Sequence, residues 1–343
     1  MKSASLLLGI CLLFTCRSAS GQAALRRIPL PGDGSWDYLT VDATGRRLYV
    51  AHEVCVHVID LDRQQAVGEI SPTPGVHGIA VVPDLGLGFT TDGADATVTV
   101  FDLKTLAVVR TLKVEGAKPD GILYEPFTRR LFTFDGDSDN TCAFDAASGR
   151  TLGTLDLGGA PEAAASDGAG AVFVNLEDRA EVVRFDPATL AITARWPLAP
   201  AHTPTALALD RANHRLLCCC RSRNLVVLDS DTGARVADLP IGTGVDSIAL
   251  DAMHHRAFVS CGDGTVTVIT WGDSTHYRVA GTITTQPGAK TLAYDPEGQR
   301  LYLSAAQFGP TPPPTAGQPK PRRAILPGTF AVLVVDVPAE SAP

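Results

Sequence analysis

The stretch VTVFDLKTLAVVRTLKVEGAKPDGILY, residues 98–124, decides the fold of this chain. It reads as a strand that ends at Asp102, a tight turn, a second strand that runs to Val114, a glycine break and a third strand that opens at Pro119. Short β-branched runs bounded by Gly, Pro and Asp are typical of strands, and no helical periodicity separates them. The stretch therefore predicts consecutive antiparallel strands with tight connections.

The same sequence pattern recurs along the chain, and two positions within it give the length of the repeat. The acidic residue that ends the pattern recurs in steps of 42, 43, 41 and 43 residues, at Asp60, Asp102, Asp145, Asp186 and Asp229. The residue that closes the next apolar run has seven copies, which are Asp42, Val82, Glu125, Asp167, Asp210, Asp251 and Asp295. A period in the low forties with four short strands per copy is typical of a β-propeller. We therefore predict an all-β, seven-bladed β-propeller with four-stranded antiparallel blades.

The two ends of the array indicate how the ring closes. The seventh copy supplies three strands, the third at residues 330–335, and a short tail at residues 338–343 follows. Residues 25–30 occupy the place of an outer strand before the first copy. We expect this N-terminal strand to complete blade seven, which would leave no open sheet edge between the first and last blades. Residues 22–337 are then a single propeller domain.

The first 21 residues differ from the repeat. Lys2, an apolar core at residues 6–14 and small residues at 18–21 are typical of a secretory signal peptide, which is too short to act as a membrane anchor. The alternative is a lipoprotein box at residues 13–16, but the residues before its cysteine are poor choices for one. We expect a periplasmic or secreted bacterial protein with no transmembrane span.

Net charge narrows the range of partners. The chain carries 29 Lys and Arg against 37 Asp and Glu, a formal net charge of −8. Removal of the signal peptide would take away Lys2 and Arg17 and change the net charge from −8 to −10. A mildly acidic surface without a basic stripe disfavours nucleic acid and anionic membranes as partners. The expected partner is a small molecule, a peptide or an envelope protein, and we expect a monomer.

Six cysteines follow the predicted signal peptide, and three of them are consecutive at residues 218–220. This triple ends the second strand of the fifth copy, and Cys261 takes the matching place in the sixth. One interpretation is a soft-metal site, a redox site or a vicinal disulfide. Because no CxxC pair or His at zinc spacing accompanies the triple, we prefer small apolar residues that fill tightly packed blades. A disulfide that involves Cys220 or Cys261 stays open in an oxidising compartment.

One position lacks an apolar residue in every copy. It lies five residues before the second position that gives the repeat length and just ahead of the first strand, and it holds Asp37, His77, Asp120, Glu162, Thr205, Asp246 and Lys290. Since the first strand of a propeller blade is the innermost, these seven side chains should form a ring around one mouth of the central channel. This ring is the leading candidate for a ligand-binding site.

The connections between second and third strands should open on the same face as the ring, because alternate connections of an up-and-down sheet emerge together. They contribute the polar residues His52, Asp92, Asp135, Asn175 and Arg221. In the seventh copy this connection expands to a Pro-rich insertion at residues 307–327 with a basic cluster. An insertion of this length is either a lid over the ring or a disordered flap.

The chemistry of the ring allows several interpretations. Its side chains can be no more than solvated polar surface. A sharper hypothesis is a bound Ca²⁺, for which four ring carboxylates offer oxygen ligands, namely Asp37, Asp120, Glu162 and Asp246. His77 could act as a proton shuttle, but a single His without a nucleophile is weak evidence for catalysis. No catalytic residue is assigned and no cofactor is expected, with bound Ca²⁺ as the alternative.

Two pairs of adjacent strands resemble a known repeat. RLYV at residues 47–50 precedes VHVID at 56–60, and VFVN at 172–175 precedes VVRFD at 182–186. They are similar to the YVTN repeat of YncE-like bacterial β-propellers, over essentially all of the chain after the predicted signal peptide. The resemblance implies an exported seven-bladed propeller and says little about function, since one fold hosts many functions. The His-rich motif of the related lactonase-like propellers is not found.

Two functions follow as hypotheses. The first is an exported, non-catalytic binding or scaffold propeller that holds a small ligand or a protein partner at the charged mouth of its channel. The alternative is a lactonase-like hydrolase with a metal at the mouth and with His77 or His52 as base. The hydrolase needs a bound ion, or a close pair of His and carboxylate at the mouth, whereas the binding protein needs neither.

Overall fold

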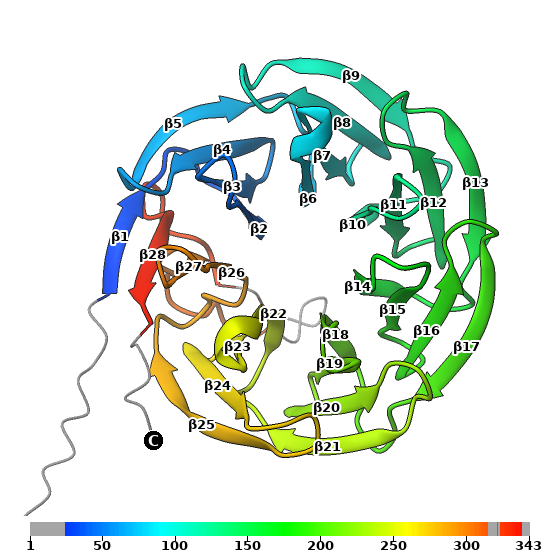
Figure 1. The fold of residues 1–343 in the computed structure, drawn as a ribbon. Helices are drawn as coiled ribbons and strands as arrows, with labels where there is room; N and C mark the ends of the chain where they lie inside the picture. Colours follow the sequence, from blue (N-terminus) through cyan, green and yellow to red (C-terminus); the bar gives the residue numbers. More distant parts are fainter. Residues whose placement is uncertain (1–24, 315–320, 322, 338–343) are drawn as a thin grey trace, which may run out of the picture.

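The computed structural model describes residues 25–314, 321 and 323–337. Within these residues the chain forms seven four-stranded antiparallel sheets, arranged as blades around a central channel (Figure 1). The two helical elements in this part of the chain are single turns, η1 (Pro83–Leu85) and η2 (Ala252–His254). The predicted all-β, seven-bladed propeller is confirmed.

The blades follow the repeat, and in blades one to six the four strands succeed one another from the channel outward. Blade one consists of β2 (Trp36–Asp42), β3 (Arg47–His52), β4 (Cys55–Asp60) and β5 (Gln65–Ile70). Blade two consists of β6 (Val76–Val82), β7 (Leu87–Asp92), β8 (Thr97–Asp102) and β9 (Val108–Lys113). Blade three consists of β10 (Pro119–Glu125), β11 (Arg130–Asp135), β12 (Asn140–Asp145) and β13 (Thr151–Asp156). Blade four consists of β14 (Pro161–Ser166), β15 (Val172–Leu176), β16 (Glu181–Asp186) and β17 (Ala191–Pro197).

Blades five and six follow the same order, and blade seven departs from it. Blade five consists of β18 (Pro204–Asp210), β19 (Arg215–Cys220), β20 (Asn224–Asp229) and β21 (Arg235–Pro240). Blade six consists of β22 (Val245–Asp251), β23 (Arg256–Cys261), β24 (Thr265–Trp271) and β25 (Tyr277–Thr284). Blade seven combines β26 (Leu292–Asp295), β27 (Arg300–Ala305) and β28 (Ala331–Asp336) with the N-terminal strand β1 (Leu25–Pro29).

The acidic residue that marks the repeat closes the hairpin between the third and fourth strands. Asp102 Oδ1 accepts hydrogen bonds from the backbone N–H groups of Thr105 at 2.7 Å and Lys104 at 3.0 Å. The hydrogen bonds from Thr105 above all hold the pKa of Asp102 below its usual value. Asp186 accepts the equivalent pair in blade four. Short acidic side chains form such turns with the backbone that follows them, so the mark of the repeat has a structural origin.

The ring is closed by the two ends of the array. Strand β1 pairs antiparallel with β28, from Leu25 opposite Val335 to Pro29 opposite Ala331. The two strands lie side by side at the rim (Figure 1). The N-terminal strand thus completes blade seven as expected, and no open edge is left between the first and last blades of the described chain.

The cysteines belong to the core between the blades. Residues 218–220 and Cys261 are fully buried, and the six cysteines of the described residues are all free thiols. Burial raises the pKa of Cys220 and of Cys261 to about 12, which keeps both thiols protonated and unreactive. The structure agrees with the packing interpretation of the triple, and the disulfide alternatives are not formed.

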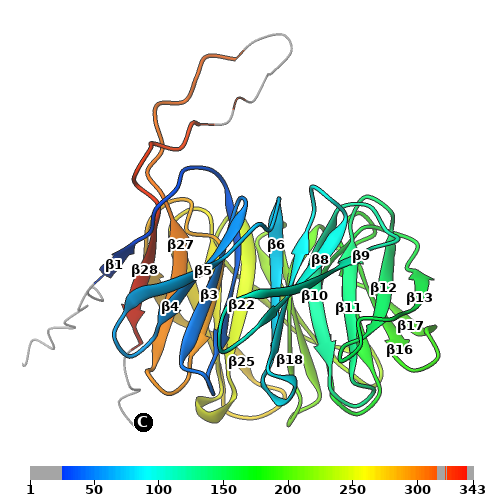
Figure 2. The ribbon, with the colours of Figure 1, turned by 90° about the horizontal axis from the view of Figure 1, so that it is seen from above.

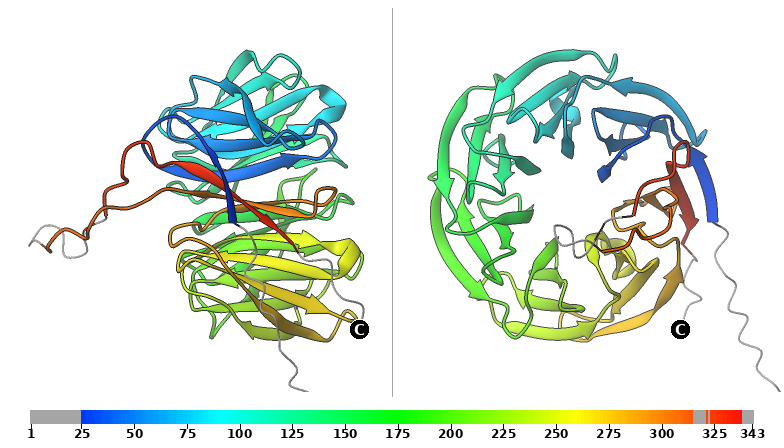
Figure 3. Two further views of the ribbon diagram at one scale, coloured as in Figure 1. Left: turned by 90° about the vertical axis from the view of Figure 1, so that its left-hand side faces the viewer. Right: turned by 180° about the vertical axis from the view of Figure 1, so that it is seen from behind.

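Some predictions concern residues outside the described ones. They are the signal peptide at residues 1–21, the tail at 338–343 and part of the insertion at 307–327. The insertion connects β27 to β28, and its described part extends away from the disc (Figure 2 and Figure 3). An antiparallel bridge joins Phe308 to Ile325 within it. No helix among the described residues is long and apolar enough to cross a membrane.

Candidate functional site

An irregularity at the start of the inner strands positions the predicted ring. In blades one to six the pairing of the first strand with the second shifts register where the ring residue stands, for example between Pro119 and Gly121 on either side of Asp120. A bulged residue leaves the regular pairing, and its side chain can therefore be aimed in a new direction. The bulges recur with the repeat and place ring residues at one end of the channel.

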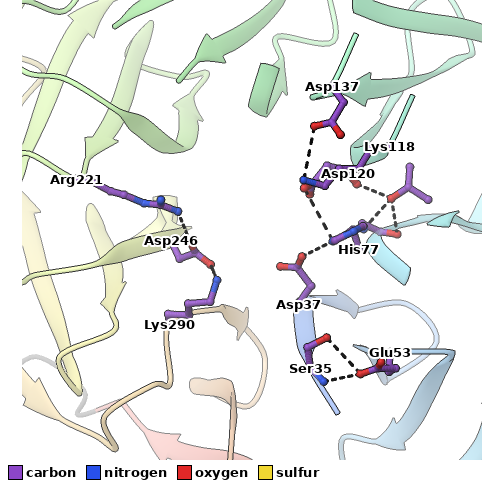
Figure 4. Close-up of polar contacts among 12 residues, drawn as sticks. Ser35, Asp37, Glu53, His77, Lys118, Asp120, Asp137, Arg221, Asp246 and Lys290 are labelled. Atoms are coloured by element: carbon purple, nitrogen blue, oxygen red, sulfur yellow. Dashed lines mark hydrogen bonds and ion pairs between the residues drawn. The ribbon is translucent and has the colours of Figure 1, made fainter. Parts of the chain in front are cut away.

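Blades one to three contribute an acid and histidine cluster to the mouth (Figure 4). His77 Nδ1 lies 2.6 Å from Asp37 Oδ2 and 3.9 Å from Asp120 Oδ2. Burial alone would lower the pKa of His77, but the hydrogen bond to Asp37 and the two carboxylate charges raise it above its usual value. We call these three residues the titratable wall, because their only cation can lose its charge near neutral pH.

Blades five to seven contribute a second cluster, which faces the first across the channel (Figure 4). Lys290 Nζ lies 2.5 Å from Asp246 Oδ2, and Arg221 Nη2 lies 3.4 Å from Asp246 Oδ1. Arg221 also approaches Glu177 at 3.3 Å. We call Arg221, Asp246 and Lys290 the permanent wall, since Lys and Arg stay charged at neutral pH. The buried carboxylate of Asp246 is therefore matched by two cations.

Glu162 of blade four has no such match. No hydrogen bond or ion pair to its carboxyl is found within the described residues. Burial, followed by the charges of Asp120 and Glu177, raises the pKa of Glu162 to about 9. Burial and the charge of Asp37 likewise raise the pKa of Asp120 to about 6. At neutral pH Glu162 is therefore a neutral acid in an acidic field, and a nearby cation would favour its ionised form.

Sequence reasoning missed one residue of the channel below the ring. This residue is Tyr38, which has a large side chain. In the other six copies the residue after the ring position is small, namely Gly78, Gly121, Ala163, Ala206, Ser247 and Thr291. Tyr38 lines a cavity of about 230 Å³ together with Glu162 and Asp246. Burial, and then the charges of four ring carboxylates beginning with Asp120, raise the pKa of Tyr38 well above its usual value. Comparing the copies one position further along would have revealed this exception.

Thr205 does not act as a ring residue. Its side chain is fully buried, and its hydroxyl donates a hydrogen bond to the carbonyl of Val245 at 3.0 Å. The bond connects blade five to blade six. The prediction for this position is therefore corrected, because a short hydroxyl side chain satisfies the neighbouring backbone instead of facing the channel.

The structure also corrects most of the predicted loop residues. Four of them belong to strands and are at most 2% exposed, namely His52, Asp92, Asp135 and Asn175. Asn175, for example, donates a hydrogen bond from Nδ2 to the carbonyl of Ala206 at 3.0 Å. The second strands extend one or two residues further than the sequence indicated, which turns these side chains into the blades. Of this set, Arg221 lies at the mouth.

A cation would fit one part of the ring. One donor atom from each of Asp37, His77 and Asp120 lies within 4.8 Å of the donor atoms of the other two. The four carboxylates predicted as ligands form no single group of this kind among the described residues, since Glu162 and Asp246 stand on other blades. One nitrogen and two carboxylates suit a transition metal better than Ca²⁺, which takes oxygen ligands.

Comparisons with known proteins agree on the fold. No family model matches the sequence, and no curated protein matches it. A chain of Kuenenia stuttgartiensis hydrazine synthase is similar with a TM-score of 0.69 at 15% identity, over 80% of this chain and 92% of that chain. A chain of the mitotic checkpoint complex is similar with a TM-score of 0.69 at 14% identity, over 95% of this chain and all of that chain. At such identity the likeness shows the fold alone, and the YncE-like family stays a prediction.

Proposed function

We propose that this protein is an exported, non-catalytic binding propeller that holds a small molecule with an ammonium group at the mouth of its channel. The observation that carries the proposal is Tyr38, which replaces a small residue in one copy of seven and stands in the field of the ring carboxylates. An aromatic face and carboxylates together attract an organic cation, and more strongly so in an enclosed site. A propeller supports a binding or scaffold role in general, so this proposal concerns what is bound.

The size and charge of the site limit the ligand. The cavity has a volume of about 230 Å³. Pockets for drug-sized ligands usually have about 300–1,000 Å³, so a smaller molecule is favoured here. Arg221, which is about half exposed, offers a cation to an anionic group of the ligand. We therefore propose an amino acid or a similar zwitterion, with its ammonium group toward Tyr38 and Glu162 and its anionic group toward Arg221.

Binding should release a proton from the protein. Glu162 is neutral at pH 7 in the free protein, because its pKa is about 9. An ammonium group beside it would lower this pKa, so that the carboxyl ionises in the complex. The affinity should therefore rise with pH from neutral to about 9, as long as the ammonium group of the ligand stays charged.

Calorimetry tests the proposal directly. The purified protein is titrated with the common amino acids and with simple alkylamines, each in two buffers of different ionisation heat. We expect heat from at least one probe and proton release on binding. Tyr38→Leu should weaken binding about 10-fold, as expected for loss of a cation–π contact at a half-buried aromatic ring. Glu162→Gln should remove the proton release, whereas Glu115→Gln on the surface should change neither quantity.

Two results would overturn the binding proposal. One is the absence of heat with every probe. The other is an affinity for the bound probe that is unchanged in Tyr38→Leu. A ligand that binds without proton release would retain the site and remove the role proposed for Glu162.

A lactonase-like, metal-dependent hydrolase remains the second candidate, because Asp37, His77 and Asp120 bring three donor atoms together. It requires stoichiometric metal at the mouth and hydrolysis of lactones or esters that a chelator abolishes. Asp120→Asn should then remove both the metal and the activity. Hydrolysis that persists with Asp120→Asn would come from elsewhere and would exclude this candidate.

Export is proposed from the character of residues 1–21 alone. N-terminal sequencing of the protein recovered from the cell envelope or the medium would test it. A mature chain that begins near residue 22 supports export, and an intact N-terminus in the cytoplasm contradicts it.

A further inference from the structure

A second group of chemically special side chains lies in blade one, away from the functions assigned above. His52 ends β3 and Cys55 begins β4, and the two residues pair across a turn of two residues. His57 comes two residues after Cys55, so it points to the same face of the sheet. The pattern His-x-x-Cys-x-His therefore gathers two imidazoles and one thiol on one face of a single hairpin.

The distances between these side chains are close to those around a metal ion. His52 Nδ1 lies 3.0 Å from His57 Nε2, and Cys55 Sγ lies 3.7 Å from the same nitrogen. One donor atom from each residue lies within 4.8 Å of the other two. A tetrahedral ion with bonds of about 2.0 Å to nitrogen and 2.3 Å to sulfur separates two nitrogens by about 3.3 Å and nitrogen from sulfur by about 3.5 Å. For these two distances shifts of a few tenths of an ångström would suffice, and the third distance, from His52 to Cys55, is at most 4.8 Å.

The group is enclosed, and its polar atoms are incompletely satisfied. His52 and His57 are 2% and 3% exposed, and His52 Nε2 has no hydrogen-bond partner among the described residues. Phe330 stacks on the ring of His52 with 4.0 Å between centroids. Gly32 passes so close that a Cβ there would lie 2.8 Å from His52 Cε1.

The equivalent hairpins of other blades are closed by different chemistry. In blade two, Asp92 accepts hydrogen bonds from the hydroxyls of Thr99 at 2.6 Å and Thr90 at 2.8 Å. In blade three, Asp135 accepts one from the thiol of Cys142 at 3.2 Å. One carboxylate and its donors thus occupy these hairpin ends, although Asp135 Oδ1 has no hydrogen-bond partner among the described residues. Closing the hairpin does not require two imidazoles and a thiol, so blade one calls for another explanation.

A neighbouring carboxylate could orient one of the imidazoles. Glu69 on β5 has Oε2 3.9 Å from His57 Nδ1, and its side chain is 46% exposed. This placement leaves His57 Nε2 directed at His52 and Cys55. Carboxylates that accept a hydrogen bond from a metal-binding imidazole commonly fix its ring, and Glu69 would have to approach His57 by about 1 Å to do so.

We propose that His52, Cys55 and His57 bind one thiophilic transition-metal ion, Zn²⁺ or Cu⁺, through two imidazole nitrogens and one thiolate. Both ions accept this donor set. Binding forms the metal–sulfur bond and releases the thiol proton of Cys55 to solvent, with no change of oxidation state. No fourth His, Cys, Asp or Glu joins the group within the described part of the chain, so one coordination position is open to water or another small ligand.

Cobalt provides the first test, because it reports on the thiolate without any variant. The purified full-length protein is titrated with Co²⁺ under reducing, anaerobic conditions and its absorption spectrum recorded. We expect a thiolate-to-cobalt charge-transfer band that saturates at one equivalent and disappears when Zn²⁺ is added. A protein that binds no Co²⁺, or binds it without this band, would overturn the proposal.

Variants then locate the site. Cys55→Ser should lower the affinity for Zn²⁺ or Cu⁺ by more than about 100-fold, since even loss of an outer partner costs about 10-fold to 100-fold. Glu69→Gln should cost about 10-fold. Cys142→Ser, a change at a buried thiol of the equivalent hairpin in blade three, should leave the affinity unchanged. Equal loss in Cys55→Ser and Cys142→Ser, or none in either, would contradict the assignment.

Competition between the two ions completes the experiment. The protein is loaded with Zn²⁺ or with Cu⁺, desalted, and analysed for metal by mass spectrometry. Retention of one equivalent of either ion supports the site, and the ion retained when both are present identifies the preferred one. Loss of both ions on desalting would exclude a resident metal and leave His52 and His57 as packing residues.

Discussion

The titratable wall and the permanent wall face each other across the channel mouth, and each stabilises carboxylates in a different way (Figure 4). On the permanent wall, Asp246 has two cations, Lys290 and Arg221, that keep their charge. On the titratable wall, Asp37 and Asp120 share one cation, His77, whose charge depends on pH. The charge of the mouth is therefore fixed on one side and set by pH on the other.

Glu162 stands between the two walls and belongs to neither. Its pKa of about 9 records the energy needed to place a negative charge there without a partner. The comparison teaches that the mouth is deficient in cations at one position, and a bound cation would correct this deficiency. Substitutions in each wall, and at the position between them, separate these contributions.

The largest effect on stability is expected from Glu162→Gln. The pKa of Glu162 is raised from 4.5 to about 9, so its favourable contribution is complete below 4.5 and is lost progressively as pH rises to about 9. The isosteric neutral side chain avoids this loss, and the free energy of unfolding at pH 7 should increase by about 2 kcal/mol. Urea unfolding at pH 5, 7 and 8.5 measures the gain. Glu115→Gln is the control, and a gain that does not grow with pH would contradict the raised pKa.

The next largest effect is a decrease in the free energy of unfolding when the permanent wall is broken. Lys290→Met leaves the 7%-exposed Asp246 with the longer contact to Arg221 alone. Breaking a fully buried pair costs about 3–5 kcal/mol, and because the Lys290 side chain is 42% exposed we expect about 1–2 kcal/mol here. The double variant Asp246→Asn with Lys290→Met should regain most of the loss in urea unfolding. Additive effects of the two changes would show that the pair is not coupled.

The titratable wall should show a pH dependence that the permanent wall lacks. The pKa of His77 is raised in the folded protein, so its contribution to stability is complete below the unfolded value near 6.5 and is lost as pH rises through the folded value. The stability advantage over His77→Gln should therefore shrink toward higher pH, by on the order of 0.5 kcal/mol. Urea unfolding from pH 5.5 to 8.5 measures it. A stability advantage that increases with pH would contradict the raised pKa of His77.

The smallest effect on stability is expected from Arg221→Ala. The Arg221 side chain is 47% exposed and its contacts to Glu177 and Asp246 are 3.3 and 3.4 Å long. Such an ion pair contributes about 0.5 kcal/mol or less to folding. The affinity for the proposed zwitterion should nevertheless fall about 10-fold, which corresponds to loss of one charge contact. Unchanged affinity would remove Arg221 from the binding site while leaving Tyr38 and Glu162 in place.

The architecture was predictable because each repeat contains the same signals for strands and turns. Asp102 and Asp186 mark the same hairpin in different blades, and the hydrogen bonds that make Asp suitable there are local. The closure by residues 25–29 followed from counting strands, since the last copy lacks one. Local turns and a count of strands are properties that one sequence contains completely.

The site was only partly predictable, because side-chain direction depends on single-residue details of register. Thr205 occupies a ring position but bonds to backbone, and Asp92 and Asp135 fall inside strands that extend slightly further than expected. Since successive residues of a strand point to opposite faces, an error of one residue reverses the environment of a side chain. Tyr38 was visible in the sequence as the exception to a column of small residues.

The pairing of β1 with β28 has a mechanical consequence. Leu25 lies opposite Val335, so the two strands leave their shared ladder at the same end. A force that pulls on both ends of the chain would therefore load the hydrogen bonds one after another. This is the unzipping geometry, in contrast to the shear geometry in which all bonds bear the force together. The seam that completes the ring is for this reason the place where a pulled propeller should open first, starting from Leu25 and Val335 and proceeding toward Pro29.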